Sequence, residues 1–175
     1  MLESPAKMHT DHAPQTAISQ PHAVSVRRLV EFVLQAGDLS SGGFQRRDRA
    51  QLDTQCHKQL QRSRAEGYET EVEIAYRAED ADLPAEVRGR IDGLYASNEP
   101  VIIEEIKTTM LSLDLVIKEH NLLHWAQAQC YAYMYARQHN LGGISIRLTY
   151  YHLDSRYRRK IQVVLKRGKP PWYSF

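Results

Sequence analysis

The chain has 175 residues, enough for one domain with a hydrophobic core. Its net charge of +2 averages two opposed regions: residues 66–105 carry 12 acidic and 3 basic side chains, and residues 141–175 carry 8 basic side chains and 1 acidic one. No apolar run approaches the roughly 20 residues that span a bilayer, and the N-terminus shows no secretory signal pattern. These properties exclude an integral membrane protein and predict a cytoplasmic one.

The motifs that are absent exclude further classes. The sequence contains no G-x-x-x-x-G-K-[ST] pattern, so it has no P-loop for an ATP-driven motor, and it contains no G-x-G-x-x-G pattern. Its two cysteines, Cys56 and Cys130, cannot form a four-thiolate zinc or iron–sulfur site within this chain. One disulfide stays open as an alternative, although reduced thiols are expected in the cytoplasm.

The first part of the chain divides into a tail and two helices. Residues 1–23 show no hydrophobic period and are rich in polar residues and proline, which predicts a flexible tail before a single domain over residues 24–175. A very polar helix is predicted over residues 46–65. Before it, a helix is predicted from Ser25, its N-cap, to near Gly37, because apolar residues repeat with the spacing of one helix face: Val26, Leu29, Val30, Val33 and Leu34.

Three strands are predicted next. Apolar side chains alternate with other residues over residues 72–76, which predicts the first strand. A second strand is expected over residues 86–95, and an apolar run from Val101 begins a third strand that continues to Lys107. Because these strands lie close together and are joined by short connections, they predict an antiparallel meander.

The C-terminal half predicts one long helix and one or two strands. Residues 110–121 fit neither period, residues 122–138 predict a helix, residues 144–150 alternate as a fourth strand, and residues 161–165 indicate a fifth. The expected order is therefore ααβββαβ(β). This order predicts an α/β fold with a central mixed sheet flanked by helices.

Three charged residues of the predicted meander carry the chemistry. Asp92 lies within a strand, where an ionised carboxylate is disfavoured unless a partner stabilises it. Glu105 and Lys107 lie two residues apart in the next strand, so their side chains share one face. A hairpin brings Asp92 beside Glu105, and a divalent cation such as Mg²⁺ or Mn²⁺ would relieve their repulsion. With the Lys107 ammonium group at the same place, the pattern indicates phosphodiester hydrolysis.

The E-x-K pattern alone is weak evidence, because exposed strands often carry acids and lysines. The run Val101–Lys107 (VIIEEIK) has little polar alternation, however, which is typical of a strand buried on both faces. Buried charges need a partner or a function. The apolar run, together with Asp92 in the preceding strand, therefore favours a functional site over a solvated surface.

Asp92 followed by Glu105-Ile106-Lys107 resembles the D…(D/E)-x-K signature of the PD-(D/E)XK nuclease superfamily. The order of motifs agrees with that core over about residues 46–152. The segments G-R-I-D-G-L and E-E-I-K-T-T also resemble the sequence of the nuclease segment of some DinG/Rad3-like helicases. Three further features are similar to the RecB-like branch: His57 in the polar helix, the run Gly89–Gly93 (G-R-I-D-G), and Gln127 with Tyr131 as a Q-x-x-x-Y motif.

The resemblance implies a restriction-endonuclease-like core and a role for each matching residue. It makes Lys107, Glu105 and Asp92 the catalytic residues, with Lys107 as the catalytic lysine. It places Gln127 and Tyr131 at the edge of the site, in contact with the nucleic acid, and makes Glu71 a weaker candidate for an acid behind the metal ligands. One or two ions of Mg²⁺ or Mn²⁺ would be held by His57, Asp92, Glu105 and the Ile106 carbonyl.

The sequence departs from the family pattern at two points. Ile91 stands where the proline of "PD" would lie, a position that varies enough in the family to leave the assignment standing. Many iron–sulfur members of the branch carry four cysteines, one upstream and three near the C-terminus. Cys56 and Cys130 lie at neither place, so no iron–sulfur cluster is predicted.

Several assignments keep a structural alternative. Gln129 and Tyr133 repeat the spacing of the Q-x-x-x-Y pair, so the register of that motif stays open. His57 can equally be a solvated helix residue, and His124 is a weaker candidate for a substrate contact. The basic C-terminal region either binds phosphates or forms a solvated hairpin: Arg156, Arg158, Arg159, Lys160, Lys166, Arg167 and Lys169.

The resemblance predicts a metal-dependent deoxyribonuclease that acts on single-stranded ends or flaps in DNA repair or recombination, with a helicase as a candidate partner. The alternative is a non-catalytic nucleic-acid-binding module of a helicase–nuclease assembly. A metal-dependent ribonuclease or toxin stays open as a third interpretation, and so do the endonuclease and exonuclease modes. In each case the expected partner is nucleic acid and not a membrane.

Overall fold

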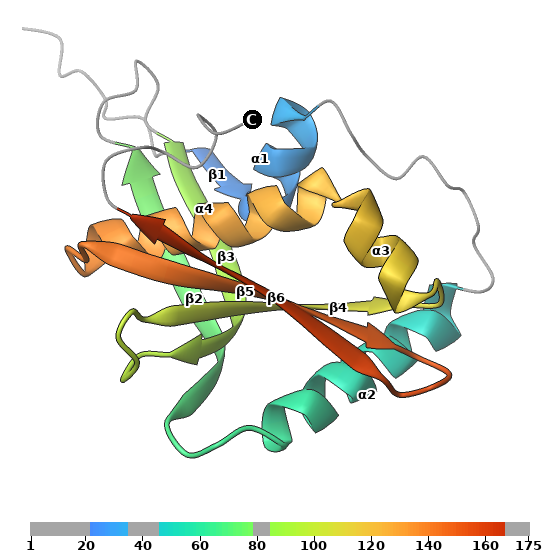
Figure 1. Ribbon diagram of the computed structural model, residues 1–175. Helices are drawn as coiled ribbons and strands as arrows, with labels where there is room; N and C mark the ends of the chain where they lie inside the picture. The colour runs from blue at the N-terminus through green and yellow to red at the C-terminus, as the bar shows by residue number, and fades with distance from the viewer. Residues whose placement is uncertain (1–21, 35–45, 79–84, 167–175) are drawn as a thin grey trace, which may run out of the picture.

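A six-stranded mixed sheet forms the centre of the protein (Figure 1). The computed structural model describes residues 22–34, 46–78 and 85–166, so most of the predicted tail and the last basic residues lie outside the described part. The strands are β1 (His22–Ser25), β2 (Tyr68–Ala78), β3 (Ala85–Tyr95), β4 (Ile102–Thr109), β5 (Gly143–His152) and β6 (Arg158–Lys166).

Strand β3 has two different partners along one of its edges. On the opposite edge, β2 runs antiparallel along the whole strand. On the shared edge, β1 pairs in parallel with residues 85–88, whereas β4 pairs antiparallel with residues 93–95. Among the described residues, positions 89–92 of β3 therefore have no neighbouring strand on this edge, and the sheet opens there.

β4 continues the sheet beyond this opening. It pairs in parallel with β5, which pairs antiparallel with β6. The β2–β3–β4 run confirms the predicted antiparallel meander, and the parallel pairs make the sheet mixed, as predicted. Residues 102–106 of β4 are all buried, which confirms that this strand is covered on both faces.

Helices cover both faces of the sheet (Figure 1). Ile103 lies in the main core with residues of α1 (Val26–Val33) and α4 (Leu122–Gln138). Ile106, on the other face because it is three residues further along the strand, lies in a small second cluster with Leu60 of α2 (Arg46–Arg62). The short helix α3 (Leu113–Glu119) precedes α4.

Most predicted elements are present with shifted ends. α1 ends at Val33 and not near Gly37, a residue that lies outside the described part. The predicted N-cap of α1 is confirmed, because Ser25 Oγ accepts a hydrogen bond from the Arg28 backbone at 3.2 Å. α2 ends at Arg62 rather than at residue 65, and α4 has its predicted bounds. The fifth strand is present as β6. The α/β fold with a central mixed sheet flanked by helices is confirmed.

Two elements add to the predicted order. β1 begins at His22, inside the range predicted as tail, and it is a strand because β3 offers it an edge, not because its residues alternate. α3 occupies residues 113–119 within the segment that fits neither period, and Ser112 Oγ caps it by accepting from the Leu115 backbone. Both elements are too short for a hydrophobic period to reveal them.

A buried ion pair joins the chain just after α2 to β4. Arg64 Nη2 donates to Glu104 Oε1 at 2.5 Å, and the Thr149 hydroxyl donates to the same carboxylate oxygen. Both charged side chains are almost completely buried. Removing one partner from a buried ion pair typically costs about 3–5 kcal/mol. The pair therefore holds the end of α2 close to β4.

Candidate functional site

An open cleft of about 760 Å³ lies where the edge of β3 is unpaired. Its walls come from α1, α2 and α4 and from strands β2, β3 and β4. The lining is largely polar or charged: Arg27, Thr54, His57, Lys58, Glu71, Arg90, Asp92, Glu105, Lys107, Thr108 and Gln127. The carboxylates, the lysine, the imidazole and the glutamine singled out in the sequence thus face one cavity.

Asp92 stands at the point where β3 and β4 separate. The last residue pair there joins Gly93 to Glu104, so Asp92 and Glu105 occupy the next cross-strand position. In place of a backbone ladder bond, Asp92 Oδ2 accepts a hydrogen bond from Ile106 N at 2.8 Å. Asp92 therefore lies beside Glu105, as the predicted hairpin requires.

Glu105 and Lys107 share one face of β4, as their spacing predicts. Lys107 Nζ lies 2.7 Å from Glu105 Oε1 and donates to Gln127 Oε1 at 3.1 Å. Glu105 is only 1% exposed, and its second oxygen, Oε2, is buried without a hydrogen-bond partner within the described part of the chain. A buried carboxylate oxygen without a partner is costly, so this atom suits contact with a cation.

Burial shifts the titration of both carboxyl groups. Desolvation, followed by the charge of Asp92, raises the pKa of Glu105 to about 7, although Lys107 opposes the shift. Desolvation also raises the pKa of Asp92, against the opposing effects of the Ile106 N–H group, His57 and Lys107. One ammonium group therefore does not neutralise the pair, and a bound cation would favour both ionised forms.

α4 brings Gln127 and Tyr131 to the strands, one helical turn apart. Gln127 accepts the hydrogen bond of the Lys107 ammonium group. Burial raises the pKa of Tyr131, and hydrogen bonds with the Gln127 side chain and the Arg90 backbone lower it. Gln127 is therefore held between the lysine of the site and a buried tyrosine.

The packing of two tyrosines favours one register of the Q-x-x-x-Y motif. The Tyr131 ring crosses Gly89, where an added Cβ atom would collide with it, which explains the first glycine of G-R-I-D-G. Tyr133 packs edge-on against Tyr76, with ring centroids 5.8 Å apart. Gln127 contacts Lys107, and Tyr131 hydrogen-bonds with Gln127, which favours the register Gln127 with Tyr131.

α2 contributes His57 to the same cleft. His57 Nδ1 lies 3.9 Å from Asp92 Oδ1, and each side chain is 19% exposed. Gln61, one turn further along the helix, donates to the Asp92 backbone carbonyl at 2.8 Å and to Glu71 Oε1 at 3.0 Å. α2 is very polar, and among its described side chains Leu60 is the buried apolar contact, so Gln61 contributes to how the helix docks.

Glu71 has a strained backbone next to this contact. Its φ angle of 55° lies in the left-handed region, which residues other than glycine seldom adopt, although it sits within β2. Gln61 holds one carboxylate oxygen, and Arg90 Nε lies 2.6 Å from the other. Such strain persists where surrounding contacts over-determine it, often at functional sites. Gln61 is a supporting residue that no sequence motif indicated, and Arg90 lies within the G-R-I-D-G run but was not assigned a role from the sequence.

The donors suit a hard divalent cation, but they do not converge as a ready-made metal site. Within residues 22–34, 46–78 and 85–166, no group of three His, Cys, Asp or Glu side chains is placed to hold a metal ion. Asp92 and Glu105 are nevertheless adjacent, desolvated and incompletely neutralised. Carboxylate oxygens of this kind are preferred ligands of Mg²⁺ and Mn²⁺, so the residues fit the ion that the sequence predicts.

The described basic residues of the C-terminal hairpin do not line this cleft. Arg156, Arg158, Arg159 and Lys160 are exposed, and Arg159 Nη2 lies 3.7 Å from Asp114 Oδ1. The side chains from residue 166 onwards lie outside the described part. No disulfide joins the two cysteines, and burial raises the pKa of the Cys130 thiol to about 11.

Comparison with protein-family models identifies the class of protein. Residues 7–171 match the model of the PD-(D/E)XK nuclease superfamily, and the chain belongs to that superfamily. Its members are nucleases, which act on phosphodiester bonds and generally use divalent metal ions. This match confirms the resemblance at the level of the superfamily.

One of two similar solved structures supports this fold. The crystal structure of SSO0001 is similar with a TM-score of 0.56 at 18% identity, over 88% of this chain and 72% of that one. A phage-related exonuclease from Haemophilus somnus 129PT has a TM-score of 0.42 at 15% identity, over 82% and 70% of the two chains. No curated protein matched the sequence. Within the described residues, no helix is long and apolar enough to cross a membrane.

The raised pKa of Glu105 predicts a stability that depends on pH. Between the ordinary pKa of 4.5 and the folded value of about 7, the folded state binds more protons than the unfolded one, so the free energy of unfolding falls as pH rises. At pH 8, with a chelator present to remove metal ions, the free energy of unfolding of Glu105→Gln should exceed that of wild type by about 1–3 kcal/mol. Urea unfolding measures this difference. The exposed Glu99→Gln is the control, and parallel pH profiles for Glu105→Gln and wild type would contradict the expectation.

The two hydrogen bonds of Gln61 predict a role in docking α2. Gln61→Leu leaves the Asp92 carbonyl and Glu71 without this donor, so the free energy of unfolding should fall by about 1–3 kcal/mol. Hydrogen exchange of the α2 amides should become faster. Gln59→Leu, an exposed position on the same helix, should change neither measurement. Equal exchange in Gln61→Leu and wild type would show that other contacts dock the helix.

Proposed function

We propose that this protein is a Mg²⁺- or Mn²⁺-dependent deoxyribonuclease. The observation that carries the proposal is the Lys107 ammonium group, held between Glu105 and Gln127 beside Asp92 in an open cleft. A lysine next to two desolvated carboxylates is the set of groups that metal-assisted hydrolysis of a phosphodiester needs. Superfamily membership supports the same chemistry.

His57, Asp92, Glu105 and the Ile106 carbonyl are the proposed ligands of one or two ions. When bound, the ion lowers the pKa of a water molecule and screens negative charge on the phosphate. The proposal is supported by the unpartnered Oε2 of Glu105 and by the 3.9 Å approach of His57 to Asp92. Because burial raises the pKa of both carboxyl groups, a bound cation would favour their ionised forms.

Lys107, Glu105 and Asp92 are the proposed catalytic residues, and each has a partner that fixes it. Lys107 donates to a phosphate oxygen and stabilises the negative charge that develops during attack. Gln127 keeps the ammonium group in place, and the buried Tyr131 hydrogen-bonds with Gln127. Gln127 lines the cleft and is a proposed contact to the nucleic acid strand, whereas Tyr131, which is only 5% exposed, is proposed to act through Gln127.

Single-stranded DNA ends or flaps are the proposed substrate, in DNA repair or recombination, with a helicase as a candidate partner. His57, the G-R-I-D-G run and the Q-x-x-x-Y pair support this choice because they resemble the RecB-like branch. The contacts of these residues around one cleft agree with a shared role.

A non-catalytic nucleic-acid-binding module is the second candidate. One observation favours it: within the described residues, the proposed ligands do not converge as a formed metal site. Such a module would keep the fold and bind a strand without turnover.

Lys107→Ala should reduce cleavage by about 100-fold or more, because the charge that stabilises the reacting phosphate is lost. The assay uses end-labelled single- and double-stranded DNA with Mg²⁺ or Mn²⁺, and single-stranded DNA should be cut faster by the wild-type protein. Lys118→Ala, an exposed lysine of α3, is the matched control and should retain full activity. Cleavage by Lys107→Ala at the wild-type rate would refute the proposed role of this lysine.

Metal titration separates the two candidate functions. Calorimetry with Mn²⁺ should show binding to the wild-type protein. Replacement of the ligands by Asp92→Asn and Glu105→Gln should weaken it on the order of 10- to 100-fold, because the amides carry no charge. Absence of Mn²⁺ binding to the wild-type protein would favour the binding module.

A further inference from the structure

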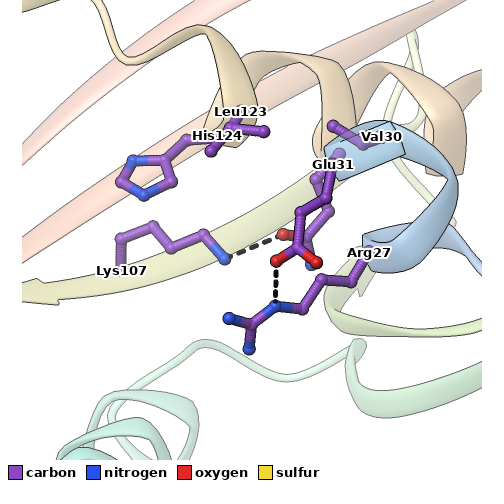
Figure 2. A pocket seen from close by; sticks show the side chains of 7 residues that line it. Arg27, Val30, Glu31, Lys107, Leu123 and His124 are labelled. Carbon is purple, nitrogen blue, oxygen red and sulfur yellow. Dashed lines mark hydrogen bonds and ion pairs between the residues drawn. The ribbon is translucent and has the colours of Figure 1, made fainter. Parts of the chain in front are cut away.

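A second, smaller pocket of about 230 Å³ adjoins the cleft, between α1 and α4 (Figure 2). It is lined by Val30, Glu31, Leu123 and His124, together with three residues that also line the cleft: Arg27, Lys107 and Gln127. Figure 2 shows the side chain of Lys107 running along the floor of this pocket below His124. The two cavities therefore meet at the lysine that faces the proposed reaction.

The pocket has an apolar and aromatic side. Val30 is buried in the main core, and Leu123 packs against that core from the start of α4. The His124 ring is held by Tyr150, whose hydroxyl lies 3.2 Å from Nδ1. Burial, assisted by the charge of Lys107, lowers the pKa of His124 to about 4, so its ring is neutral at pH 7.

The pocket also has an acidic group, Glu31, which follows Val30 on α1. Glu31 Oε1 accepts a hydrogen bond from Arg27 Nε at 2.8 Å, four residues earlier on α1. The charge of Arg27 is thus already met by Glu31. A carboxylate and a neutral imidazole are unfavourable neighbours for a phosphate group, whereas a carboxylate accepts hydrogen bonds from the amino groups of nucleobases.

We propose that this pocket is a subsite for the base of the nucleotide next to the scissile phosphate. The inference rests on the proposed nuclease function and names the part of the substrate that the second cavity receives. A phosphate at Lys107 places its neighbouring nucleotide at the junction of the two cavities, because Lys107 and Gln127 line both. The base packs against His124 and Leu123, and Glu31 accepts from its amino group.

This arrangement gives each part of the nucleotide a different surface. The charged phosphate meets the lysine and the carboxylate site, and the flat face of the base meets the side chains of His124 and Leu123. Stacking on a ring is tolerant of sequence because every base has a π face, so His124 supplies affinity. Glu31 supplies a preference for bases with an exocyclic amino group over thymine.

Cleavage of single-stranded oligonucleotides with one abasic residue tests the subsite. The abasic residue is moved through each position around the cut, and rates are measured with Mn²⁺. The wild-type rate should fall on the order of tenfold when the abasic residue occupies the subsite, and little elsewhere. The cleavage rate of His124→Ala on intact DNA should be lower than that of wild type by a similar factor. The rate of this variant should fall no further on the substrate with the abasic residue at the subsite. Glu119→Gln, exposed on α3, should keep the wild-type profile.

The outcomes distinguish this proposal from the function on which it rests. If the wild-type protein cuts DNA but tolerates an abasic residue at every position, or if His124→Ala keeps the wild-type abasic profile, the subsite is refuted and the nuclease function stands. If the wild-type protein cuts no substrate, both fail. Circular dichroism checks that His124→Ala folds. Glu31→Gln, at a half-exposed position of α1, is a second variant. It should reduce the preference of the enzyme for cytosine and adenine over thymine at the subsite. An unchanged preference would refute the role of Glu31.

Discussion

The site depends on the hydrogen bond from the Ile106 N–H group to the side chain of Asp92. β1 and β4 share one edge of β3 and leave residues 89–92 unpaired between them. A strand edge leaves backbone donors and acceptors without partners, and here a carboxylate takes the place of the missing neighbour on the β4 side. The bond keeps Asp92 beside Glu105 while the strands separate, so an open cleft forms with both acids in its wall.

Burial determines the electrostatics of that wall. β4 is covered on both faces, so Glu105 is desolvated and Lys107 does not fully offset the cost of its charge. The same strand carries Glu104 on its other face, where Arg64 and Thr149 satisfy one of its carboxylate oxygens. Each of these adjacent glutamates is paired through Oε1 and keeps Oε2 without a partner among the described residues. They differ in position, because Glu104 fastens Arg64 in the interior whereas Glu105 lines the cleft.

Helices from both faces of the sheet complete the site, and they are held differently. α4 belongs to the main core and places Gln127 rigidly on Lys107. Among the described side chains, α2 contributes to a small apolar cluster, and Gln61 helps to bring His57 towards Asp92. The lysine and its glutamine thus stand beside the main core, while the histidine comes from a helix on the other face of the sheet. α1 adds the second pocket beside Lys107, next to the cleft.

The sequence by itself determined the meander, the long α4 helix and the pairing of Glu105 with Lys107, because these follow from local periods of two and 3.6 residues. It also indicated Asp92, since a charge within a strand calls for a partner. Only the tertiary structure decided the contacts of Gln61 and Arg90 with Glu71, the choice of Gln127 over Gln129, and the presence of β1. These features join segments that lie far apart in the chain, and no local period constrains which distant residues meet when the sheet opens and the helices close over it.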